Sequence, residues 1–293
     1  MLSKPEIACW VCGENSIQFE DSKSLGHIDL GPDKFKISDS EYGKSLPRYR
    51  CIACSFIQCD TPIDMVSFYQ AMSDDEYDQG EVARQRQFED LIRTFRIAKG
   101  SKWLDVGCGT GALVEMANKM GYKAMGIDPS IALIEKGLAK DRPIFCATLE
   151  NFSLGDELFD VISLIDVIEH VDNPIAIMNL VSKHLKPNGF VCLSTPDVSS
   201  IFARVLKMKW WHVRVAHIGY FDKKTLSLIF GKSGFETLKL FRPNWYFDSN
   251  YFVDRLSKYL PFIPKKLLKR LLRDRVIRIN LRDSWAVVGQ KSA

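Results

Sequence analysis

Short apolar runs alternate with helix-like stretches through the middle and the C-terminal part of the chain. The runs that predict strands are Lys123–Ile127, Phe159–Ile165, Gly189–Thr195 and Ser284–Gln290, together with a segment ending near Val106. The stretches that predict helices are Ala112–Met120, Asp222–Lys232 and a segment from about Glu81 to Arg96. Strands separated by helices are typical of an α/β fold with a largely parallel sheet.

A glycine-rich turn follows the first of these strands. It reads Leu104-Asp105-Val106-Gly107-Cys108-Gly109-Thr110-Gly111, and a predicted helix comes directly after it. Glycine is needed where the backbone turns sharply and where a ligand approaches the main chain without meeting a Cβ. A strand, a glycine-rich turn and a helix in this order form the usual site for an adenosine-bearing cofactor, and a structural loop is the alternative.

Two acids accompany the turn. Asp105 precedes the first glycine by two residues, and Asp128 ends the next predicted strand, twenty-three residues after Asp105. An acid at the end of the second strand of such folds accepts hydrogen bonds from ribose hydroxyls. The Gly-x-Gly-x-Gly spacing differs from the Gly-x-Gly-x-x-Gly pattern that holds a dinucleotide pyrophosphate.

The turn resembles motif I of the class I S-adenosylmethionine (SAM) methyltransferases. Farther along, Phe159-Asp160-Val161-Ile162 followed by Glu169-His170-Val171 is similar to a second signature of that family, including its ubiquinone O-methyltransferase-like members. The resemblance covers roughly residues 100–241 and the last predicted strand. It implies a Rossmann-like seven-stranded sheet with helices on both faces, and SAM as the cofactor.

The resemblance also implies roles for individual residues. Asp105 is expected near the ammonium of the methionine moiety, and the backbone of Leu149 is expected near adenine, since Thr148 stands where many relatives have Asp. Tyr77 and Arg84 belong to a segment that covers the cofactor in relatives, although Arg84 also suits an exposed helix position. The residues assigned to cofactor binding are Asp105, Gly107, Cys108, Gly109, Gly111, Asp128, Leu149, Asp166 and Tyr77.

Histidines supply the candidate base. Methyl transfer from a sulfonium is an in-line displacement, so the protein aligns donor and acceptor, and an oxygen nucleophile usually also needs a base. The resemblance places His170 near the methyl group, and His217 lies just beyond the fifth strand, where relatives often carry a His-Leu-x-x-Phe pattern. His217, His170 and Glu169 are the candidate catalytic residues. A hydrogen-bonded structural histidine is the alternative for His217 and His170. No role is assigned to His27, His184 or His212.

A divalent cation is a further option. Asp166-x-x-Glu169-His170 resembles the Glu-x-x-Glu-His cluster of the ubiquinone-pathway O-methyltransferases, where a divalent ion assists. Two carboxylates suit a hard cation such as Mg²⁺, which could lower the pKa of an acceptor oxygen. Asp replaces the first Glu, so its reach is shorter, and relatives without metal also carry Glu-His-Val.

Four of the eight cysteines form two Cys-x-x-Cys knuckles. They are Cys9, Cys12, Cys51 and Cys54, with thirty-eight residues between the knuckles. Two such turns complete a tetrahedral zinc site, and a site with four protein ligands is structural. A thioredoxin-like redox pair would need one motif within a βαβ pattern, and disulfides are disfavoured in a reducing compartment. The remaining cysteines, Cys59, Cys108, Cys146 and Cys192, are predicted to be small core residues.

A basic, aromatic insertion spans residues 242–283. Residues 255–282 contain ten Lys or Arg and one acid, a net charge of +9, while the whole chain carries +4. Leu267, Leu268, Leu271 and Leu272 form one stripe on a helix wheel. The segment therefore predicts a helix packed on the domain with a solvated basic face, an interfacial helix at anionic lipid, or an RNA-binding surface.

Length and composition suggest one full domain and accessory pieces. The 293 residues divide into a zinc-ribbon-like module (1–62), a helical lid or linker (63–99) and the methyltransferase domain (100–293). No run reaches about eighteen apolar residues, so no transmembrane helix is expected. The N-terminus lacks the apolar core of a signal peptide, so a cytoplasmic location is expected, with peripheral contact at the inner membrane face through residues 255–282 as an option.

The function expected from these features is SAM-dependent O-methylation in cell-envelope biosynthesis. A zinc module before a SAM domain is similar to methyltransferases that act on sugars, so the expected acceptor is a saccharide, a nucleotide-sugar or a lipid-linked saccharide. The alternatives are a polyprenyl-quinol or small-phenol methyltransferase, an rRNA methyltransferase and a non-enzymatic SAM-binding scaffold. Zinc fingers of RNA methyltransferases have a different cysteine spacing, which counts against nucleic acid as a partner.

Overall fold

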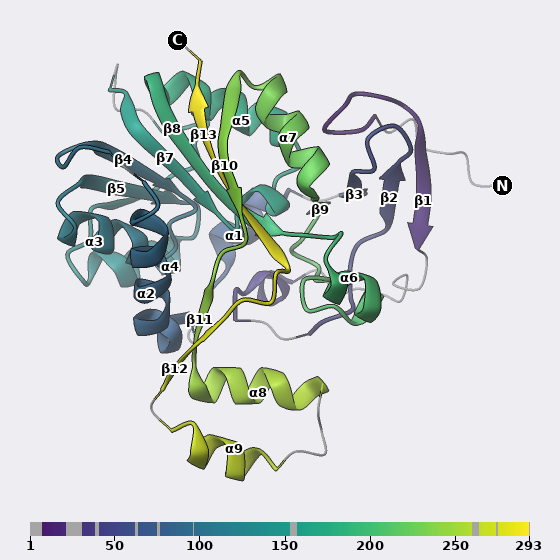
Figure 1. The fold of residues 1–293 in the computed structure, drawn as a ribbon, viewed down its shortest axis with the longest axis vertical. Helices are drawn as coiled ribbons and strands as arrows, with labels where there is room; N and C mark the ends of the chain where they lie inside the picture. Colours follow the sequence, from purple (N-terminus) through teal and green to yellow (C-terminus); the bar gives the residue numbers. More distant parts are fainter. Residues whose placement is uncertain are drawn as a thin grey trace.

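The computed structural model describes residues 8–21, 31–38, 41–61, 64–74, 77–95, 97–152, 157–259, 264–273 and 275–292. Its centre is a seven-stranded sheet in the order β10-β13-β8-β7-β4-β5-β6 (Figure 1). The strands are β4 (Lys102–Val106), β5 (Lys123–Asp128), β6 (Ile144–Cys146), β7 (Phe159–Ile165), β8 (Leu185–Pro196), β10 (Phe235–Phe241) and β13 (Ser284–Lys291). Of these strands, β13 alone runs opposite to the other six, which confirms the predicted Rossmann-like α/β sheet.

Helices cover both faces of this sheet. One face carries α2 (Glu81–Ile92), α3 (Ala112–Lys119) and α4 (Ile131–Leu138), and the other carries α5 (Pro174–His184) and α7 (Lys223–Lys232). Trp103 and Leu104 are adjacent on β4 and fully buried, yet they belong to separate hydrophobic clusters. Successive strand residues face opposite sides, so β4 is covered from both sides, as parallel sheets require.

A second, four-stranded sheet carries the cysteine knuckles. Its order is β1 (Ile17–Asp21), β2 (Arg48–Cys51), β3 (Ile57–Cys59) and β9 (Gly219–Tyr220). The last strand comes from the middle of the predicted methyltransferase domain, and Ile57 pairs with Tyr220 across the join. The predicted module of residues 1–62 therefore shares a sheet with residues 219–220. His27 and part of the connection between the knuckles lie outside the described residues.

The insertion between β10 and β13 forms an arm that projects beyond the body of the protein (Figure 1). We call residues 245–279 the basic arm. Its elements are β11 (Trp245–Asp248), α8 (Ser249–Tyr259), α9 (Lys265–Leu271) and β12 (Val276–Ile279), and β11 pairs antiparallel with β12. Residues 260–263 and 274 of the predicted basic segment lie outside the described residues.

Short elements connect these units. They are η1 (Pro32–Phe35), α1 (Met65–Ala71), η2 (Tyr77–Gly80), η3 (Ile168–His170), α6 (Ile201–Leu206) and η4 (Lys207–Lys209). The helical lid predicted for residues 63–99 corresponds to α1, η2 and α2. Helix α2 ends at Ile92, earlier than the pattern predicts, and Arg96 lies outside the described residues.

The fold tests two further predictions, one on the four cysteines outside the knuckles and one on membrane-spanning helices. Cys59, Cys108 and Cys192 are buried as predicted, whereas Cys146 is exposed, so its assignment to the core was wrong. Its strand, β6, is at the edge of the sheet, where one side has no neighbouring strand. Within the described residues, every helix is too short or too polar to span a bilayer.

Candidate active site and cysteine cluster

A cleft of about 540 Å³ opens where the parallel strands end. This volume lies within the range typical of small-molecule sites. The cleft is lined by the glycine-rich turn after β4, the end of β5, the segment after β7, the segment before β9, and β11 with the start of α8. Segments far apart in the sequence meet here because the carboxyl ends of parallel strands share one edge of the sheet.

The glycine-rich turn needs glycine for two reasons. Gly107, Gly109 and Gly111 have φ angles of +72°, +56° and +81°, in the region that glycine adopts without strain. A Cβ on Gly107 would lie 2.4 Å from Val167 Cγ2, and one on Gly109 would lie 2.6 Å from Tyr77 Oη. The turn therefore brings bare backbone to the floor of the cleft.

Asp105 lies at the centre of the sheet, between β5 and β7. The Ser163 hydroxyl donates to its Oδ1 over 2.5 Å, and the Trp103 indole N–H donates to Ser163 over 2.9 Å. Burial, with a smaller contribution from the charge of Asp128, raises the pKa of Asp105 to about 7, while the hydrogen bond from Ser163 opposes the shift. A cation placed beside this carboxylate would lower the pKa again, as the predicted contact with an ammonium requires.

Asp128 is held by backbone donors at the end of β5. Gly109 N–H donates to Oδ2 over 2.9 Å and Ser130 N–H donates to Oδ1 over 2.8 Å. Burial raises the pKa of Asp128 to about 6, while these two bonds oppose that effect. The carboxylate is fixed in the cleft wall, as expected of a group that accepts hydrogen bonds from vicinal hydroxyls.

Tyr77 covers the glycine-rich turn at Gly109. Its hydroxyl lies over Gly109, and the guanidinium of Arg84 stacks on its ring with 3.9 Å between the guanidinium carbon and the ring centroid. Arg84 also donates to the Tyr77 carbonyl. Both side chains line the cleft, so Arg84 is not simply an exposed helix residue. This placement matches the predicted lid position.

The other residues assigned to the cofactor also lie in the cleft wall. Leu149 and Cys108 are buried and line it. Asp166 follows β7 with a φ of +56° and accepts a 2.9 Å hydrogen bond from the Ser194 hydroxyl. Burial raises the pKa of Asp166 to about 6. Seven of the nine residues assigned to cofactor binding thus line the cleft, and Gly109 lies beneath Tyr77. Gly111 faces Ile144 and Arg142 instead, and the roles of all nine remain predictions.

The three candidate catalytic residues form one cluster. Glu169, His170 and His217 each offer a side-chain ligand atom, and these atoms lie within 4.8 Å of one another. The rings of His170 and His217 meet edge to face with 4.8 Å between centroids. The segment after β7 and the segment before β9 are therefore brought together at the cleft.

A hydrogen bond to a backbone carbonyl fixes the tautomer of His217, and His170 has a similar contact. His217 Nδ1 lies 2.8 Å from the His212 carbonyl, and His170 Nδ1 lies 2.7 Å from the Ala216 carbonyl. A carbonyl oxygen only accepts, so His217 Nδ1 carries the hydrogen and the lone pair of its Nε2 can accept a proton. His170 Nδ1 faces both the Ala216 carbonyl and the Tyr69 hydroxyl. Burial lowers the pKa of His170 to about 4 and the pKa of His217 well below its usual value, so both rings are neutral at pH 7.

Glu169 is buried beside the histidines. The Thr195 hydroxyl donates to its Oε2 over 2.9 Å, whereas Oε1 is buried and has no hydrogen-bond partner among the described residues. Burial raises the pKa of Glu169 well above its usual value, and the charge of Asp166 adds to this effect. A buried carboxyl with an unused oxygen is suited to binding a hydroxyl or another polar group of a ligand.

The predicted divalent-cation set differs from this cluster. Asp166 does not join Glu169 and His170 in any group of potential ligand atoms found among the described residues, and His217 takes its place. Mg²⁺ prefers oxygen ligands in octahedral geometry. Two imidazoles and one carboxyl do not fit that preference, so we derive no step through Mg²⁺.

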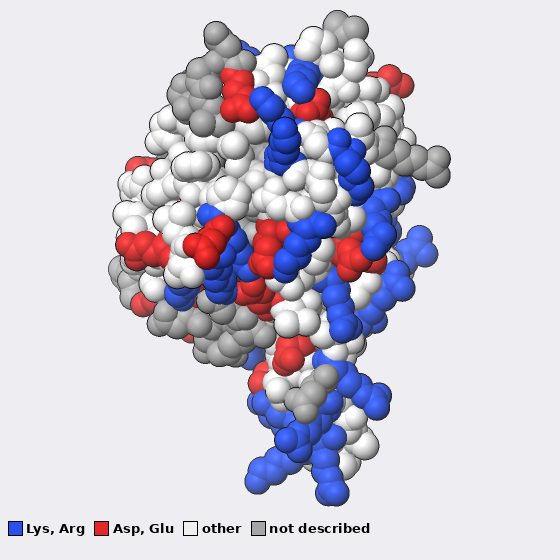
Figure 2. Space-filling view, turned by 90° about the vertical axis from the view of Figure 1, so that its left-hand side faces the viewer, with Lys and Arg blue, Asp and Glu red and all other residues white. Residues whose placement is uncertain are grey.

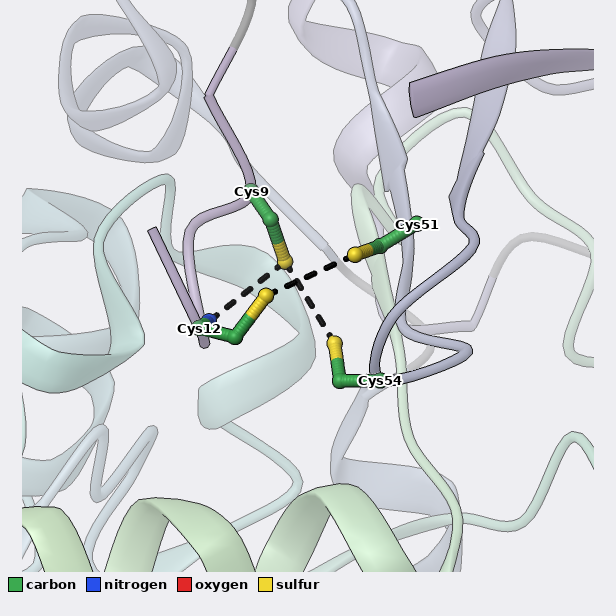
Figure 3. Close-up of side chains that lie close together, drawn as sticks. All are labelled: Cys9, Cys12, Cys51 and Cys54. Atoms are coloured by element: carbon green, nitrogen blue, oxygen red, sulfur yellow. Dashed lines mark hydrogen bonds between the residues drawn. The ribbon is translucent and has the colours of Figure 1, made fainter. Parts of the chain in front are cut away.

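The four predicted zinc ligands lie together at the start of the second sheet (Figure 3). The sulfurs of Cys9 and Cys54 are 3.5 Å apart, and those of Cys12 and Cys51 are also 3.5 Å apart. Tetrahedral zinc with Zn–S bonds of about 2.3 Å places its sulfurs roughly 3.8 Å apart. The cluster fits zinc in both ligand type and spacing.

Sequence reasoning missed several residues of the cleft. His212 lines it, and its Nε2 lies 3.4 Å from Asp283 Oδ2. Tyr69 places its hydroxyl 2.6 Å from His170 Nδ1. Phe247 and Tyr251 bring the aromatic start of the basic arm to the cleft wall. An aromatic-rich opening of the insertion was the one local signal for this last group.

The strand order, the glycine-rich turn and the acid after the second strand define a class I SAM-dependent methyltransferase fold. Residues 81–240, more than half of the chain, match the family model described as a methyltransferase domain, and the chain belongs to this family.

Relatives and solved structures agree with this family. The ubiquinone biosynthesis O-methyltransferase of Bradyrhizobium diazoefficiens is 33% identical over 116 residues, covering 38% of this chain and 46% of that protein. The chain thus spans about half the length of the curated relatives it matches. A SAM-dependent methyltransferase from Archaeoglobus fulgidus superposes with a TM-score of 0.52 at 18% identity, covering 72% of this chain and 94% of that one.

A second structure shares the fold over a longer part of the chain. It is a chain of the complex between the Haloferax volcanii Trm112 methyltransferase activator and a methyltransferase, with a TM-score of 0.54 and 13% identity. The match covers 80% of this chain and all of that one. At this identity the similarity concerns the fold alone.

Proposed function

We propose that this protein transfers the methyl group of SAM to a hydroxyl oxygen of a small or lipid-linked acceptor, with His217 as the base. The observation that carries the proposal is the position of His217 in the cofactor cleft with Nδ1 bonded to a carbonyl and Nε2 available. A neutral imidazole with a free lone pair is the form that accepts a proton.

The cleft residues bind and orient the donor. Asp105 attracts the ammonium group, Asp128 accepts from the ribose hydroxyls, and the backbone near Leu149 contacts adenine. Tyr77 closes over the glycine-rich turn and excludes water. SAM, when bound, supplies an electrophilic methyl group on a positively charged sulfur.

The acceptor hydroxyl is then held by the cluster of Glu169, His170 and His217. Methyl transfer from bound SAM would form a C–O bond as the C–S bond breaks and would leave S-adenosylhomocysteine. His217 Nε2 is the group that takes the hydroxyl proton. The His212 carbonyl keeps Nδ1 protonated and orients the ring throughout. The low pKa of His217 keeps the ring neutral and ready at physiological pH, although it makes the base weaker.

A saccharide, as a nucleotide-sugar or a lipid-linked saccharide, is the acceptor we favour. Phe247 and Tyr251 offer flat apolar faces beside polar groups in one cleft, a combination that suits a sugar ring with its hydroxyls. The alternative acceptor is a quinol or a small phenol. It is supported by the relatives named ubiquinone biosynthesis O-methyltransferases.

The test is a methyl-transfer assay with labelled SAM and two acceptor panels, one of nucleotide-sugars and lipid-linked saccharides and one of quinols and catechols. We expect a methylated saccharide, identified by mass spectrometry, and loss of product with His217→Asn. Product on the phenolic panel alone would contradict the saccharide proposal. Undiminished turnover by His217→Asn on an accepted substrate would remove the proposed base.

We further propose that the four clustered cysteines bind one structural zinc ion. Four thiolates leave no open coordination position, so this zinc would stabilise the second sheet and take no part in chemistry. Elemental analysis of the purified protein should give about one zinc per chain. A value near zero in protein purified without chelators would contradict this proposal.

A further inference from the structure

The basic arm leaves the body at the edge of the sheet that also carries the cleft. Ser284, which starts β13, pairs with Pro196 at the carboxyl end of β8, so the arm begins beside the ends of the parallel strands. Its first residues, Trp245 to Asp248, line the cleft, while α9 lies at the far end of the projection (Figure 1). The arm therefore extends outward from the mouth of the site.

Positive charge is concentrated on this projection. Residues 255–282 carry a net charge of +9, so the remainder of the chain carries −5. Lys and Arg side chains dominate the protruding end of the molecule (Figure 2). Lys269 pairs with Asp254, whereas no ion pair is found for Lys265, Lys266 or Arg270 among the described residues.

Helix α9 also exposes aliphatic side chains. Leu267 and Leu271 lie one turn apart and are 54% and 63% exposed. Leu268 and Leu272 are only partly exposed, and α9 has no fully buried residue. Packing on the domain, the first of the sequence-based alternatives, therefore leaves half of the leucine stripe in solvent.

We propose that α9 and the basic side chains around it bind an anionic lipid surface. Leu267 and Leu271 enter the interface between headgroups and acyl chains, and Lys265, Lys266 and Arg270 contact the phosphates. This proposal concerns binding alone and does not rest on the proposed activity.

The residue types of the arm favour lipid over RNA. Binding of single-stranded nucleic acid combines basic groups with aromatic rings that stack on bases. Phe247 and Tyr251 line the cleft at the start of the arm, so these rings lie near the body and away from α9. The outer end of the arm offers aliphatic side chains instead, which suit acyl chains.

Vesicle flotation with the full-length protein tests the proposal. Vesicles of phosphatidylcholine alone are compared with vesicles in which phosphatidylglycerol makes up about a third of the lipid. We expect the protein to float with the anionic vesicles only. Each basic residue near such a surface contributes about fivefold to binding, so the triple variant Lys265→Gln/Lys266→Gln/Arg270→Gln should bind about a hundredfold more weakly.

A matched control separates a specific surface from net charge. The exposed lysines Lys123, Lys183 and Lys223 lie outside the arm, and replacing all three by Gln changes the net charge equally. This control variant should keep at least about a third of the wild-type partition coefficient. Equal losses in the two triple variants would contradict a specific role for the arm.

The aliphatic contribution is tested separately with Leu267→Asn/Leu271→Asn. Both side chains are more than half exposed, so the change should leave the melting temperature unaltered, which circular dichroism would check. We expect at least a tenfold loss of vesicle binding, because two leucines leave the interface. Wild-type binding by this variant, or no flotation of the wild type, would overturn the proposal. Retention of RNA at physiological salt without vesicle binding would overturn it in favour of nucleic acid.

Discussion

The affinity for SAM should rise with pH through the range in which Asp105 ionises. Burial, with a smaller contribution from the charge of Asp128, raises the pKa of Asp105 to about 7. An ammonium group binds the ionised carboxylate, so the protein must release a proton on binding. Affinity is therefore weakest at low pH and increases as pH rises through about 7.

The size of the effect follows from the fraction of ionised carboxylate. For a pKa of about 7, this fraction rises from about 9% at pH 6.0 to about 76% at pH 7.5, an eightfold gain in affinity. Asp128, with a pKa of about 6, adds roughly a further twofold if it accepts from the ribose. The expected total is about sixteenfold, and near pH 6.5 about one proton should be released per ligand bound.

Isothermal titration calorimetry in buffers of different ionisation enthalpy measures both quantities. Methylthioadenosine provides the matched ligand, because it has the adenosine and its ribose but lacks the amino and carboxyl groups. Its affinity should rise only about twofold over the same range. Asp105→Asn should reduce the pH dependence of SAM binding to the same twofold. Equal pH dependence for the two ligands in the wild type would refute the contact between Asp105 and the ammonium.

Three further changes test other parts of the site. Gly109→Ala places a Cβ 2.6 Å from Tyr77 Oη and should weaken SAM binding at least about tenfold. The control Gly100→Ala, at φ +82° with open space around it, should lower only stability. Equal SAM affinities of the two variants would contradict the close approach of Tyr77 to Gly109. His217→Asn should lower kcat by about 10²- to 10⁴-fold with SAM affinity within about twofold, and His184→Asn should leave both unchanged. Removal of zinc by a chelator should lower the melting temperature and kcat together, and added zinc should restore both. Full turnover by the metal-free protein would show that the active site does not depend on the cysteine cluster.

Much of the fold could be predicted because its signals are local. Residues Phe159–Ile165 form β7 with the predicted bounds, and β5 exceeds its prediction by one residue. The predicted strand Gly189–Thr195 is longer in the structure, since β8 begins at Leu185. Apolar runs and glycine spacing involve residues that are neighbours in the sequence, so the strands and the turn that they specify can be predicted locally.

Contacts between distant segments were harder to predict. His212 has no motif around it. Its ring stacks on His217, and its Nε2 contacts Asp283, which lies seventy-one residues farther along the chain. The set proposed for a cation was read from one local pattern, Asp166-x-x-Glu169-His170. The positive φ of Asp166 and its bond to Ser194 hold it apart from the other two, and no sequence spacing indicates this.

The relation between the cysteine cluster and the active site illustrates the same difficulty. Composition and spacing predict a separate N-terminal module, because two knuckles are sufficient to define a zinc site. In the structure, β3 follows the second knuckle directly and pairs with β9, and Cys59 N–H donates to the Ile218 carbonyl over 2.8 Å. Ile218 follows His217 immediately, so the sheet that the cysteines stabilise also holds the backbone of the proposed base. Loss of order at the knuckles should therefore displace His217 while leaving Asp105 and the glycine-rich turn, which belong to the other sheet, in place.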